Sequence, residues 1–420
     1  MKAIVSLNSG SSSIKFALYT LDAHHSPSLS AGGKIERIGI SPRLVIRDVT
    51  AKVLLEQEWR DEAGLAHADL LAWLFDWARS HLEGREVVAI GHRVVHGGMD
   101  FFHPCLIDGR VLTQLEKLCP LAPLHQPHNL AAIHAIARIA PDMPQVACFD
   151  TAFHHDRPTL TTRFAIPRAL HDQGIRRYGF HGLSYEYIAR RLGEIDPALA
   201  TGRVIAAHLG NGASLCAIVN GRSVDTTMGF TALDGLMMGT RCGAIDPGVV
   251  LHLQTRMGMT AGEVETLLYN KSGLLGVSGI SSDMRVLSES GVSEAEEAID
   301  LFTWRIARET AALATSMGGL DGIVFTAGIG ENHADVRSRI CRQLAWLGVK
   351  VDELANSANA PVISLPASGV KVRVIPTDEE RMIALHTLAT LSEGALDHDR
   401  KIAAVGSPVK GQSCGPPPST

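Results

Sequence analysis

Short runs of apolar residues alternate along the chain with longer segments in which apolar residues recur every three or four positions. The short runs predict β-strands, and the longer segments predict amphipathic helices. Strands are expected at residues 3–7, 14–19, 87–90, 146–149, 204–208, 214–219, 322–326 and 372–375. Helices are expected at residues 66–81, 129–139, 184–192, 295–316, 334–347 and 378–391. This alternation is typical of an α/β fold.

Two connections between these elements also follow from the pattern. Residues 24–30 read HHSPSLS, and we expect a surface loop there. The helix that starts at residue 334 follows Glu331 and Asn332, whose side chains suit the N-cap of a helix.

Two strand–turn–strand segments in this pattern are alike. Residues 7–12 read LNSGSS and residues 209–214 read LGNGAS, and each segment joins two apolar runs. The likeness predicts two domains built on one hairpin plan, each directing its glycine turn at a shared cleft. Chance similarity between two glycine turns is the alternative.

Length and charge limit the possible partners. A chain of 420 residues is too long for one compact core and fits two domains. The formal net charge of -5 provides no overall attraction for nucleic acid or for an anionic membrane. Any anion must therefore be bound by a local group of residues.

The cysteine pattern and the lengths of the apolar runs indicate where in the cell the protein is located. The 7 cysteines are scattered and form no Cys-x-x-Cys pair, which argues against a disulfide framework and a zinc ribbon. No charged-then-apolar leader precedes the first strand, and no apolar run reaches the ~20 residues of a membrane span. We expect a cytoplasmic protein with a disordered tail at residues 406–420, which are rich in proline, glycine and serine.

Three glycine-containing turns follow predicted strands, at residues 8–15, 208–212 and 327–332. Such turns bring backbone N–H groups close to a ligand and suit a phosphate. The first turn adds serine hydroxyls and the ammonium of Lys15, although alone it also fits an ordinary serine-rich hairpin. The chain lacks the P-loop motif, and the sequence after Gly212 breaks the dinucleotide-binding pattern. A nucleotide cleft of another kind is expected.

Charged residues occur beside these turns. Arg93 and Arg241 lie between glycines, where two guanidinium groups would suit a carboxylate and a transferring phosphoryl group. Each could instead bind loop carbonyls. Asp150 follows an apolar strand, a common place for a metal-orienting or proton-accepting carboxylate. The carboxylates of Asp378, Glu379 and Glu380 follow another strand and suit Mg²⁺ beside a phosphate cleft. They also fit the acidic first turn of a helix, and both interpretations can hold together.

Histidines are less informative. His181 lies in a glycine-bounded aromatic turn, where a satisfied core histidine is the alternative to a functional one. The paired histidines lack a common acidic partner and are interpreted as structural or supporting groups: His92/His96, His125/His128 and His154/His155.

Taken in order, these segments resemble the acetate kinases, within the larger superfamily of acetate and sugar kinases, heat-shock chaperones and actin. The resemblance runs from residue 4 to about residue 391. It implies two duplicated actin-like (ribonuclease H-like) domains with a nucleotide cleft between them. The implied domains are residues 1–150 with a returning helix at 384–405, and residues 151–383. The segments that carry it are residues 8–16, 91–98, 122–125, 149–154, 177–182, 208–214, 235–243, 246–248, 328–332 and 376–380.

The resemblance also implies a role for individual residues. Asn8 and Glu379 match magnesium positions. The catalytic positions are Asp150, His181 and Arg241. The acyl substrate would contact Arg93, Val95, Leu124, Phe180 and Ala232. ATP would contact Lys15, His208, Leu209, Gly210, Asn211, Gly212, Asp283, Met284, Arg285, Gly328, Ile329, Gly330, Glu331 and Asn332.

The implied activity is reversible transfer of a phosphoryl group from ATP to acetate, giving acetyl phosphate and ADP. The implied metal is Mg²⁺, with Mn²⁺ as a substitute, and the implied assembly is a homodimer. Ala232 stands where the family usually has proline, which leaves propionate open as the substrate. Other departures remove no charged catalytic group: Leu183, Cys242, Ala244 and Asp378. A nucleotide-binding switch and a chaperone-like ATP hydrolase are the competing functions.

Overall fold

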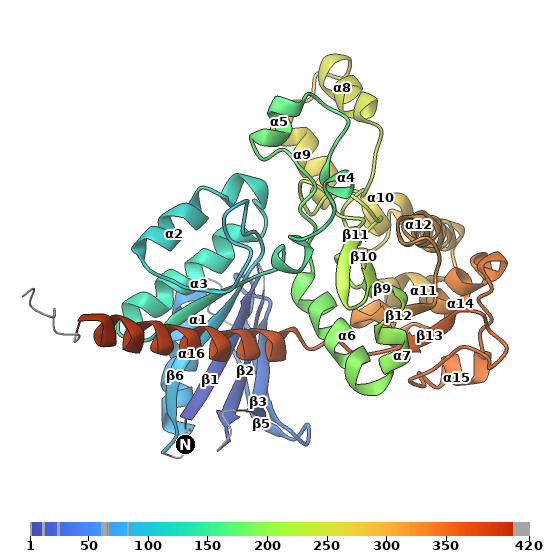
Figure 1. Cartoon of the computed structure of the whole chain (residues 1–420). Coiled ribbons are helices and arrows are strands. Elements are labelled where there is room, and N and C mark those ends of the chain that lie inside the picture. Colours follow the sequence, from blue (N-terminus) through green and yellow to red (C-terminus); the bar gives the residue numbers. More distant parts are fainter. Residues whose placement is uncertain are drawn as a thin grey trace, which may run out of the picture.

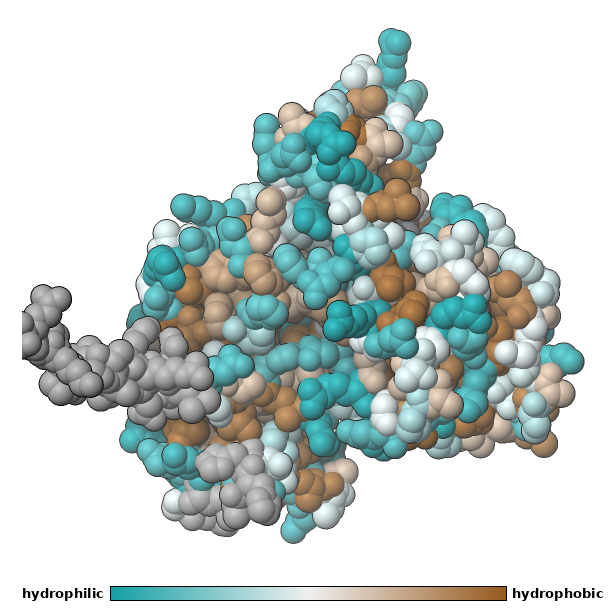
Figure 2. Space-filling model, in the orientation of Figure 1, coloured by the Kyte–Doolittle hydropathy of each residue, from teal (hydrophilic) through white to brown (hydrophobic). Residues whose placement is uncertain are grey.

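The computed structural model describes residues 2–10, 13–22, 26–59, 65, 67–81 and 84–405, with only the backbone described at residue 81 and beyond residue 393. Ser11, Ser12 and the predicted tail at residues 406–420 lie outside this part of the chain. The chain forms two lobes, each containing one β-sheet (Figure 1). Figure 2 shows one face of both lobes, with hydrophilic residues along much of the boundary between them.

The first sheet has eight strands in the order β5-β4-β3-β2-β1-β6-β8-β7. β1 pairs antiparallel with β2 and parallel with β6, and β6 pairs parallel with β8. The carboxyl ends of β1, β6 and β8 therefore meet at one edge of the sheet. The strands are β1 (Lys2–Ser9), β2 (Ile14–Leu21), β3 (Pro27–Glu36), β4 (Arg43–Asp48), β5 (Val53–Glu58), β6 (Glu86–Val94), β7 (Cys105–Leu106) and β8 (Gln145–Phe149).

The second sheet has five strands in the order β11-β10-β9-β12-β13. β9 pairs antiparallel with β10 and parallel with β12, and β12 pairs parallel with β13. The strands are β9 (Arg203–Leu209), β10 (Ala213–Val219), β11 (Arg222–Thr226), β12 (Gly322–Thr326) and β13 (Lys371–Val374).

Both sheets share one topology. The order β3-β2-β1-β6-β8 corresponds to β11-β10-β9-β12-β13, with the same parallel and antiparallel pairings. The predicted likeness between residues 7–12 and 209–214 therefore falls on the equivalent hairpins β1–β2 and β9–β10. This arrangement confirms the predicted fold class of two duplicated α/β units.

Helices connect and cover the sheets (Figure 1). The α-helices are α1 (His67–His81), α2 (Gly109–Glu116), α3 (Gln126–Ile139), α4 (Thr159–Thr162), α5 (Arg168–Asp172), α6 (Gly182–Ile195), α7 (Pro197–Ala200), α8 (Pro247–Thr255), α9 (Ala261–Asn270), α10 (Gly273–Ser278), α11 (Met284–Ser290), α12 (Ser293–Met317), α13 (Ala327–Asn332), α14 (Ala334–Gln343), α15 (Glu353–Ser357) and α16 (Glu379–Val405). Three 3₁₀ turns are η1 (Cys119–Leu121), η2 (Ala152–His154) and η3 (Ala345–Leu347).

Each sheet is packed on both faces because its strands are apolar on both sides. In the first lobe, Leu71 of α1 and Ile136 of α3 pack with Leu7, whereas Ala384 of α16 packs with Ile4. In the second lobe, neighbouring strand residues point to opposite faces. Leu215 packs with α12, and the next residue, Cys216, packs with α6.

The structure corrects three details of the sequence analysis. The loop expected at residues 24–30 is wrong at its end, because β3 begins at Pro27. The helix expected at residues 334–347 ends at Gln343 and continues as η3. Its N-cap is His333, and the expected caps Glu331 and Asn332 lie inside α13 instead.

The cysteines and helix lengths agree with the sequence analysis. Six cysteines lie in the described part of the chain, and all six are free. Among the described residues, no helix is both long and apolar enough to cross a membrane.

Candidate active site

A cleft of about 580 Å³ lies where the carboxyl ends of strands from both sheets meet. Polar and glycine residues from both lobes form its walls. The predicted site residues that line it are Asn8, Lys15, Arg93, His181, His208, Gly210, Asn211, Gly212, Gly328, Glu331 and Glu379.

Asn8, near the end of β1, lies beside Glu379, the first residue of α16. Asn8 Nδ2 donates to Glu379 Oε2 at 3.3 Å, and Asn8 Oδ1 accepts from Arg93 Nη1 at 3.2 Å. Burial would raise the pKa of Glu379, but the charges of Arg93, His208 and Lys15 lower the pKa on balance. Glu379 therefore faces the cleft as a carboxylate.

Arg93 and Asp150 join the ends of β6 and β8. Arg93 Nε donates to Asp150 Oδ1 at 2.9 Å, and Arg93 Nη2 donates to Oδ2 at 2.5 Å. Asp150 is 1% exposed. Desolvation raises the pKa of this carboxyl, and the charge of Arg93 opposes the rise. Because Arg93 occupies both carboxylate oxygens, Asp150 holds the guanidinium in a fixed orientation.

His181 immediately precedes α6 and has a left-handed backbone, with φ of 57°. Such conformations in non-glycine residues cluster at functional sites. The N–H of Gly182 donates to the carbonyl oxygen of Asp150 at 2.9 Å. A Cβ at Gly182 would lie 2.1 Å from that oxygen, so glycine is required there. This contact fixes the start of α6 against the end of β8.

The turn between β9 and β10 lies beside both His181 and Arg241. A Cβ at Gly212 would lie 3.4 Å from His181 Nε2 and 3.7 Å from Arg241 Nη2. Arg241 Nη2 also lies 3.1 Å from His125 Nε2, and Arg241 Nη1 donates to the carbonyl oxygen of Ala232 at 2.9 Å. Arg241 thus binds a loop carbonyl, as one sequence-based reading expected, and also stands beside the cleft.

The third glycine turn forms the start of α13. Ala327 has φ of 64°, and its N–H donates to Glu331 Oε1 at 2.8 Å. The N–H of Thr377 donates to the same oxygen at 3.1 Å. Glu331 thereby ties this turn to the loop that precedes α16. Gly328 meets no atom within 4 Å where a Cβ would be, so its backbone is open to the cleft.

Three of the four predicted acyl-pocket residues belong to one buried apolar cluster: Val95, Phe180 and Ala232. Ala232 connects this cluster to Arg241 through its carbonyl oxygen. The fourth residue, Leu124, is half-buried. Ala232 therefore lies next to the guanidinium of Arg241.

Several predicted ATP-contacting residues do not line this cleft. Leu209 and Met284 are buried in the core of the second lobe. Asp283 caps α11 and pairs with the exposed Arg285, with Oδ2 and Nη2 2.7 Å apart. The charges of Asp283 and Arg285 both affect the pKa of His333, the residue that follows α13. This segment therefore borders the end of α13. Three further predicted residues outside the lining belong to α13: Ile329, Gly330 and Asn332.

The cleft histidines are neutral. Burial lowers the pKa of His208 to about 4 and, together with the charges of Arg241 and Arg93, lowers that of His125 to about 3. Burial, with His208 and both arginines nearby, also brings the pKa of His181 well below its ordinary value. None of the three rings carries a charge near neutral pH.

Sequence reasoning missed some cleft residues. His125 was interpreted as a structural or supporting group, but it lines the cleft and contacts Arg241. Its membership of a segment in the family resemblance was the available signal. Ser13, Ala327 and Thr377 also line the cleft, and so does Glu380, one of the carboxylates expected beside it.

The oxygen donors of the cleft fit a hard divalent metal. Asn8, Glu379 and Glu380 supply amide and carboxylate oxygens, which Mg²⁺ prefers. Within the described ranges, no three His, Cys, Asp or Glu side chains are grouped to hold a metal by themselves.

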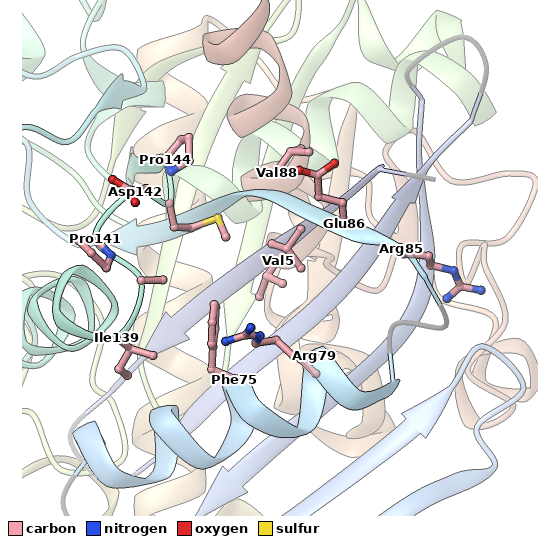
Figure 3. A pocket seen from close by; sticks show the side chains of 14 residues that line it. Val5, Phe75, Arg79, Arg85, Glu86, Val88, Ile139, Pro141, Asp142 and Pro144 are labelled. Carbon is pink, nitrogen blue, oxygen red and sulfur yellow. The ribbon is translucent and has the colours of Figure 1, made fainter.

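A second hollow, of about 670 Å³, lies on the first lobe away from these groups (Figure 3). Val5 of β1, Phe75 of α1 and Ile139 near the end of α3 contribute apolar walls, with Arg79 and Asp142 also in the lining. No predicted site residue lines this hollow. Convergent polar chemistry is therefore found in the smaller cleft between the lobes.

The duplicated lobes and the cleft between them, lined by glycine turns and charged side chains, define a class, the α/β phosphotransferases that act between two lobes. The chain belongs to the Acetokinase family, whose model matches residues 3–385. An acetate kinase of Rhodopseudomonas palustris is 53% identical over 386 residues, covering 90% of this chain and 96% of that protein. An acetate kinase of Methylocella silvestris is 50% identical over 400 residues, covering 94% and 99%.

Solved structures agree with this family. A propionate kinase from Francisella tularensis superposes with a TM-score of 0.84 at 40% identity, covering 92% of this chain and 99% of that one. The Porphyromonas gingivalis acetate kinase gives a TM-score of 0.81 at 37% identity, covering 93% and 100%. The resemblance predicted from the motifs is confirmed.

Proposed function

We propose that the protein catalyses reversible phosphoryl transfer from ATP to acetate, giving ADP and acetyl phosphate. One observation carries the proposal: Arg93, His181 and the Gly212 turn line a single cleft, with Arg241 beside that turn, in a chain from the Acetokinase family. Two guanidinium groups suit the two anions that have to meet, a carboxylate and a phosphoryl group.

The reaction needs alignment more than proton transfer. Acetate is already a carboxylate, so no base has to activate it. One acetate oxygen forms a bond to the γ-phosphorus while the bond from that phosphorus to the bridging oxygen breaks. The electron pair of the broken bond leaves with ADP. Catalysis then rests on in-line positioning and stabilisation of charge.

Each cation is assigned one anion. Arg93 holds the acetate carboxylate, and Asp150 positions Arg93 through its two-oxygen contact. Arg241 stabilises the equatorial oxygens of the transferring group. Because its lowered pKa leaves the His181 ring neutral, we assign His181 the role of a neutral hydrogen-bond donor.

ATP is assigned to the glycine turns of the second lobe. The backbones of residues 210–212 and of Gly328 face the cleft and suit phosphates, with Lys15 opposite. The segment at residues 283–285 borders α13 and would contact the nucleoside. Asn8 and Glu379 would hold Mg²⁺, or Mn²⁺ in its place. When bound, the metal supplies positive charge to the phosphates of ATP.

Propionate is the second candidate substrate. Ala232 provides a small wall in the apolar cluster with Val95 and Phe180, and a structural relative is a propionate kinase. One methylene in an apolar pocket changes binding by only about 1–3 kcal/mol, so both acids are candidates.

The family resemblance also supports a proposal for the assembly and the location of the protein. We propose a cytoplasmic homodimer. Each chain would be divided into residues 1–150 with 384–405, and residues 151–383. The packing of α16 against Ile4 of the first sheet supports the return of the chain to the first domain.

The test is an assay of the purified protein with ATP, Mg²⁺, acetate and hydroxylamine, which traps acetyl phosphate as the hydroxamate. We expect hydroxamate to form in step with ADP. Free phosphate without hydroxamate would identify an ATP hydrolase, and ATP binding without turnover would identify a nucleotide switch. Repeating the assay with propionate and butyrate compares kcat/KM across chain lengths.

A further inference from the structure

Two histidines of the cleft are stacked, and each contacts a serine. The rings of His181 and His208 lie 4.1 Å apart at 16°. His181 Nδ1 lies 2.8 Å from Ser214 Oγ, and His208 Nδ1 lies 2.9 Å from Ser184 Oγ. Because the proton of a neutral imidazole can sit on either nitrogen, the partners of these serines decide where it is.

Tyr185 sets the direction of the hydrogen bonds at His181. Its side chain is fully buried, and its hydroxyl forms a short hydrogen bond with Ser214 Oγ. Burial raises the pKa of Tyr185 well above its ordinary value, so the phenol keeps its proton. Within the described part of the chain, Ser214 is the only side chain that bonds this hydroxyl. A buried hydroxyl needs an acceptor for its proton, so Tyr185 donates to Ser214.

The hydroxyl proton of Ser214 is then left to donate to His181. Since Ser214 Oγ accepts from Tyr185, its own hydrogen is directed to His181 Nδ1. A neutral ring that accepts at Nδ1 carries its proton on Nε2. His181 Nε2 faces the position of a Cβ on Gly212, the same position that Arg241 Nη2 faces. The ring therefore presents an N–H group beside the guanidinium of Arg241.

The second histidine repeats this arrangement. Thr377 Oγ1 donates to Ser184 Oγ at 2.8 Å, which directs the hydrogen of Ser184 to His208 Nδ1. Each serine therefore contacts the histidine of the other segment. Ser184 belongs to α6, which follows His181, but it contacts His208. Ser214 pairs with His208 across the strands, but it contacts His181. Close stacking of the rings favours two neutral imidazoles over two cations.

We propose that Tyr185 and Ser214 are positioning residues that fix His181 as a neutral ring protonated at Nε2, which donates a hydrogen bond to the transferring phosphoryl group. The identity of that acceptor rests on the proposed function, whereas the position of the proton does not. Ser184 and Thr377 do the same for His208.

The position of the proton is measurable in the free enzyme by NMR of the full chain labelled with ¹⁵N-histidine. The signals of His181 are those lost in His181→Asn. His154 is an internal reference: its Nδ1 lies 2.8 Å from Ser223 Oγ and its Nε2 lies 2.9 Å from the carbonyl oxygen of Phe180. We expect His181 to match His154, protonated at Nε2 only, at neutral pH. A proton on Nδ1, or on both nitrogens, would overturn the proposal.

Tyr185→Phe removes the hydroxyl that orients Ser214. We expect a mixture of the two His181 tautomers and a fall in kcat of about ten-fold, the usual scale for an orienting partner. The KM values for ATP and acetate should stay within about two-fold, because the binding groups remain. Tyr187→Phe, on the same helix and without a hydroxyl partner among the described residues, should change neither the spectrum nor kcat.

The outcomes separate the two proposals. A Tyr185→Phe enzyme with the wild-type tautomer and wild-type kcat would overturn the positioning role of Tyr185 and Ser214. If that variant does not fold, the spectrum of the wild-type protein decides the question alone. Absence of acetyl phosphate formation by the wild-type protein would instead overturn the proposed function and leave the NMR result standing.

Discussion

Arg93 and Asp150 face each other from the ends of two adjacent parallel strands, and the guanidinium binds both oxygens of the carboxylate. The Nε–Oδ1 distance is 2.9 Å, and Arg93 Nη1 reaches Asn8 Oδ1 at 3.2 Å. Asp150 is 1% exposed, so water competes little for this contact. The pair gives the cleft a cation with a fixed orientation, which a two-oxygen substrate can use.

Asp150→Asn keeps the shape of this side chain and removes its charge. We expect a higher KM for acetate and a kcat lowered by about 10- to 100-fold, because Arg93 loses its fixed orientation. Steady-state kinetics with acetate varied at saturating ATP measures both values. Asp156→Asn changes an exposed carboxyl on the same segment and serves as the matched control. Unchanged kinetics in Asp150→Asn would refute the positioning role.

Arg241→Ala removes the guanidinium beside His181 and Gly212. We expect kcat to fall on the order of 100- to 1000-fold, the scale of losing one donor to the transition-state charge. ATP affinity, measured by calorimetric titration, should change little. Arg256→Ala is the control, because Arg256 is exposed at the end of α8. A kcat equal to that of the control would remove Arg241 from the mechanism.

Much of this site could be predicted from the sequence, because the local pattern of strands and turns determines where these residues lie. Asp150 and Arg93 follow apolar runs that form adjacent parallel strands, so their meeting could be anticipated from strand order. The two glycine hairpins likewise occupy equivalent places because each joins the same two strand positions. In these cases the backbone topology alone brings the residues together.

Other features depend on tertiary contacts that no local pattern shows. Arg241, His125 and Gly212 come from separate connections and meet only through the packing of loops between the lobes. The whole of β3 was missed, and its first residues, 27–30, were expected in a loop, because proline and serine have weak strand propensity. Pairing with β2 and β4 forms this strand.

Ala232→Val adds two methyl groups to the apolar cluster that includes Val95 and Phe180. Because the carbonyl that binds Arg241 is retained, the change acts on the size of the pocket. We expect the ratio of kcat/KM for propionate over acetate to fall about ten-fold, consistent with the cost of one methylene. An assay with acetate, propionate and butyrate measures the ratio. An unchanged ratio would place the acyl group elsewhere.

Buried histidines predict how stability depends on pH. Burial lowers the pKa of His92 and His96 to about 4, and burial with a nearby arginine lowers that of His154 to about 3. In the unfolded chain these rings titrate near 6.5. Between these values the unfolded state binds more protons, so stability rises with pH. The neutral rings contribute fully above about pH 6.5, and their contribution is lost as the pH falls towards 4.

The free energy of unfolding should therefore decrease on acidification from pH 7 to pH 5, by up to about 1.4 kcal/mol per pH unit for each fully buried histidine. Urea unfolding at a series of pH values measures the slope. His96→Gln should reduce the slope of unfolding free energy against pH by the amount that corresponds to about one bound proton. His134→Gln, at an exposed position on α3, should leave the slope unchanged. A flat profile over this range would mean that the folded protein takes up protons at these rings as readily as the unfolded chain does.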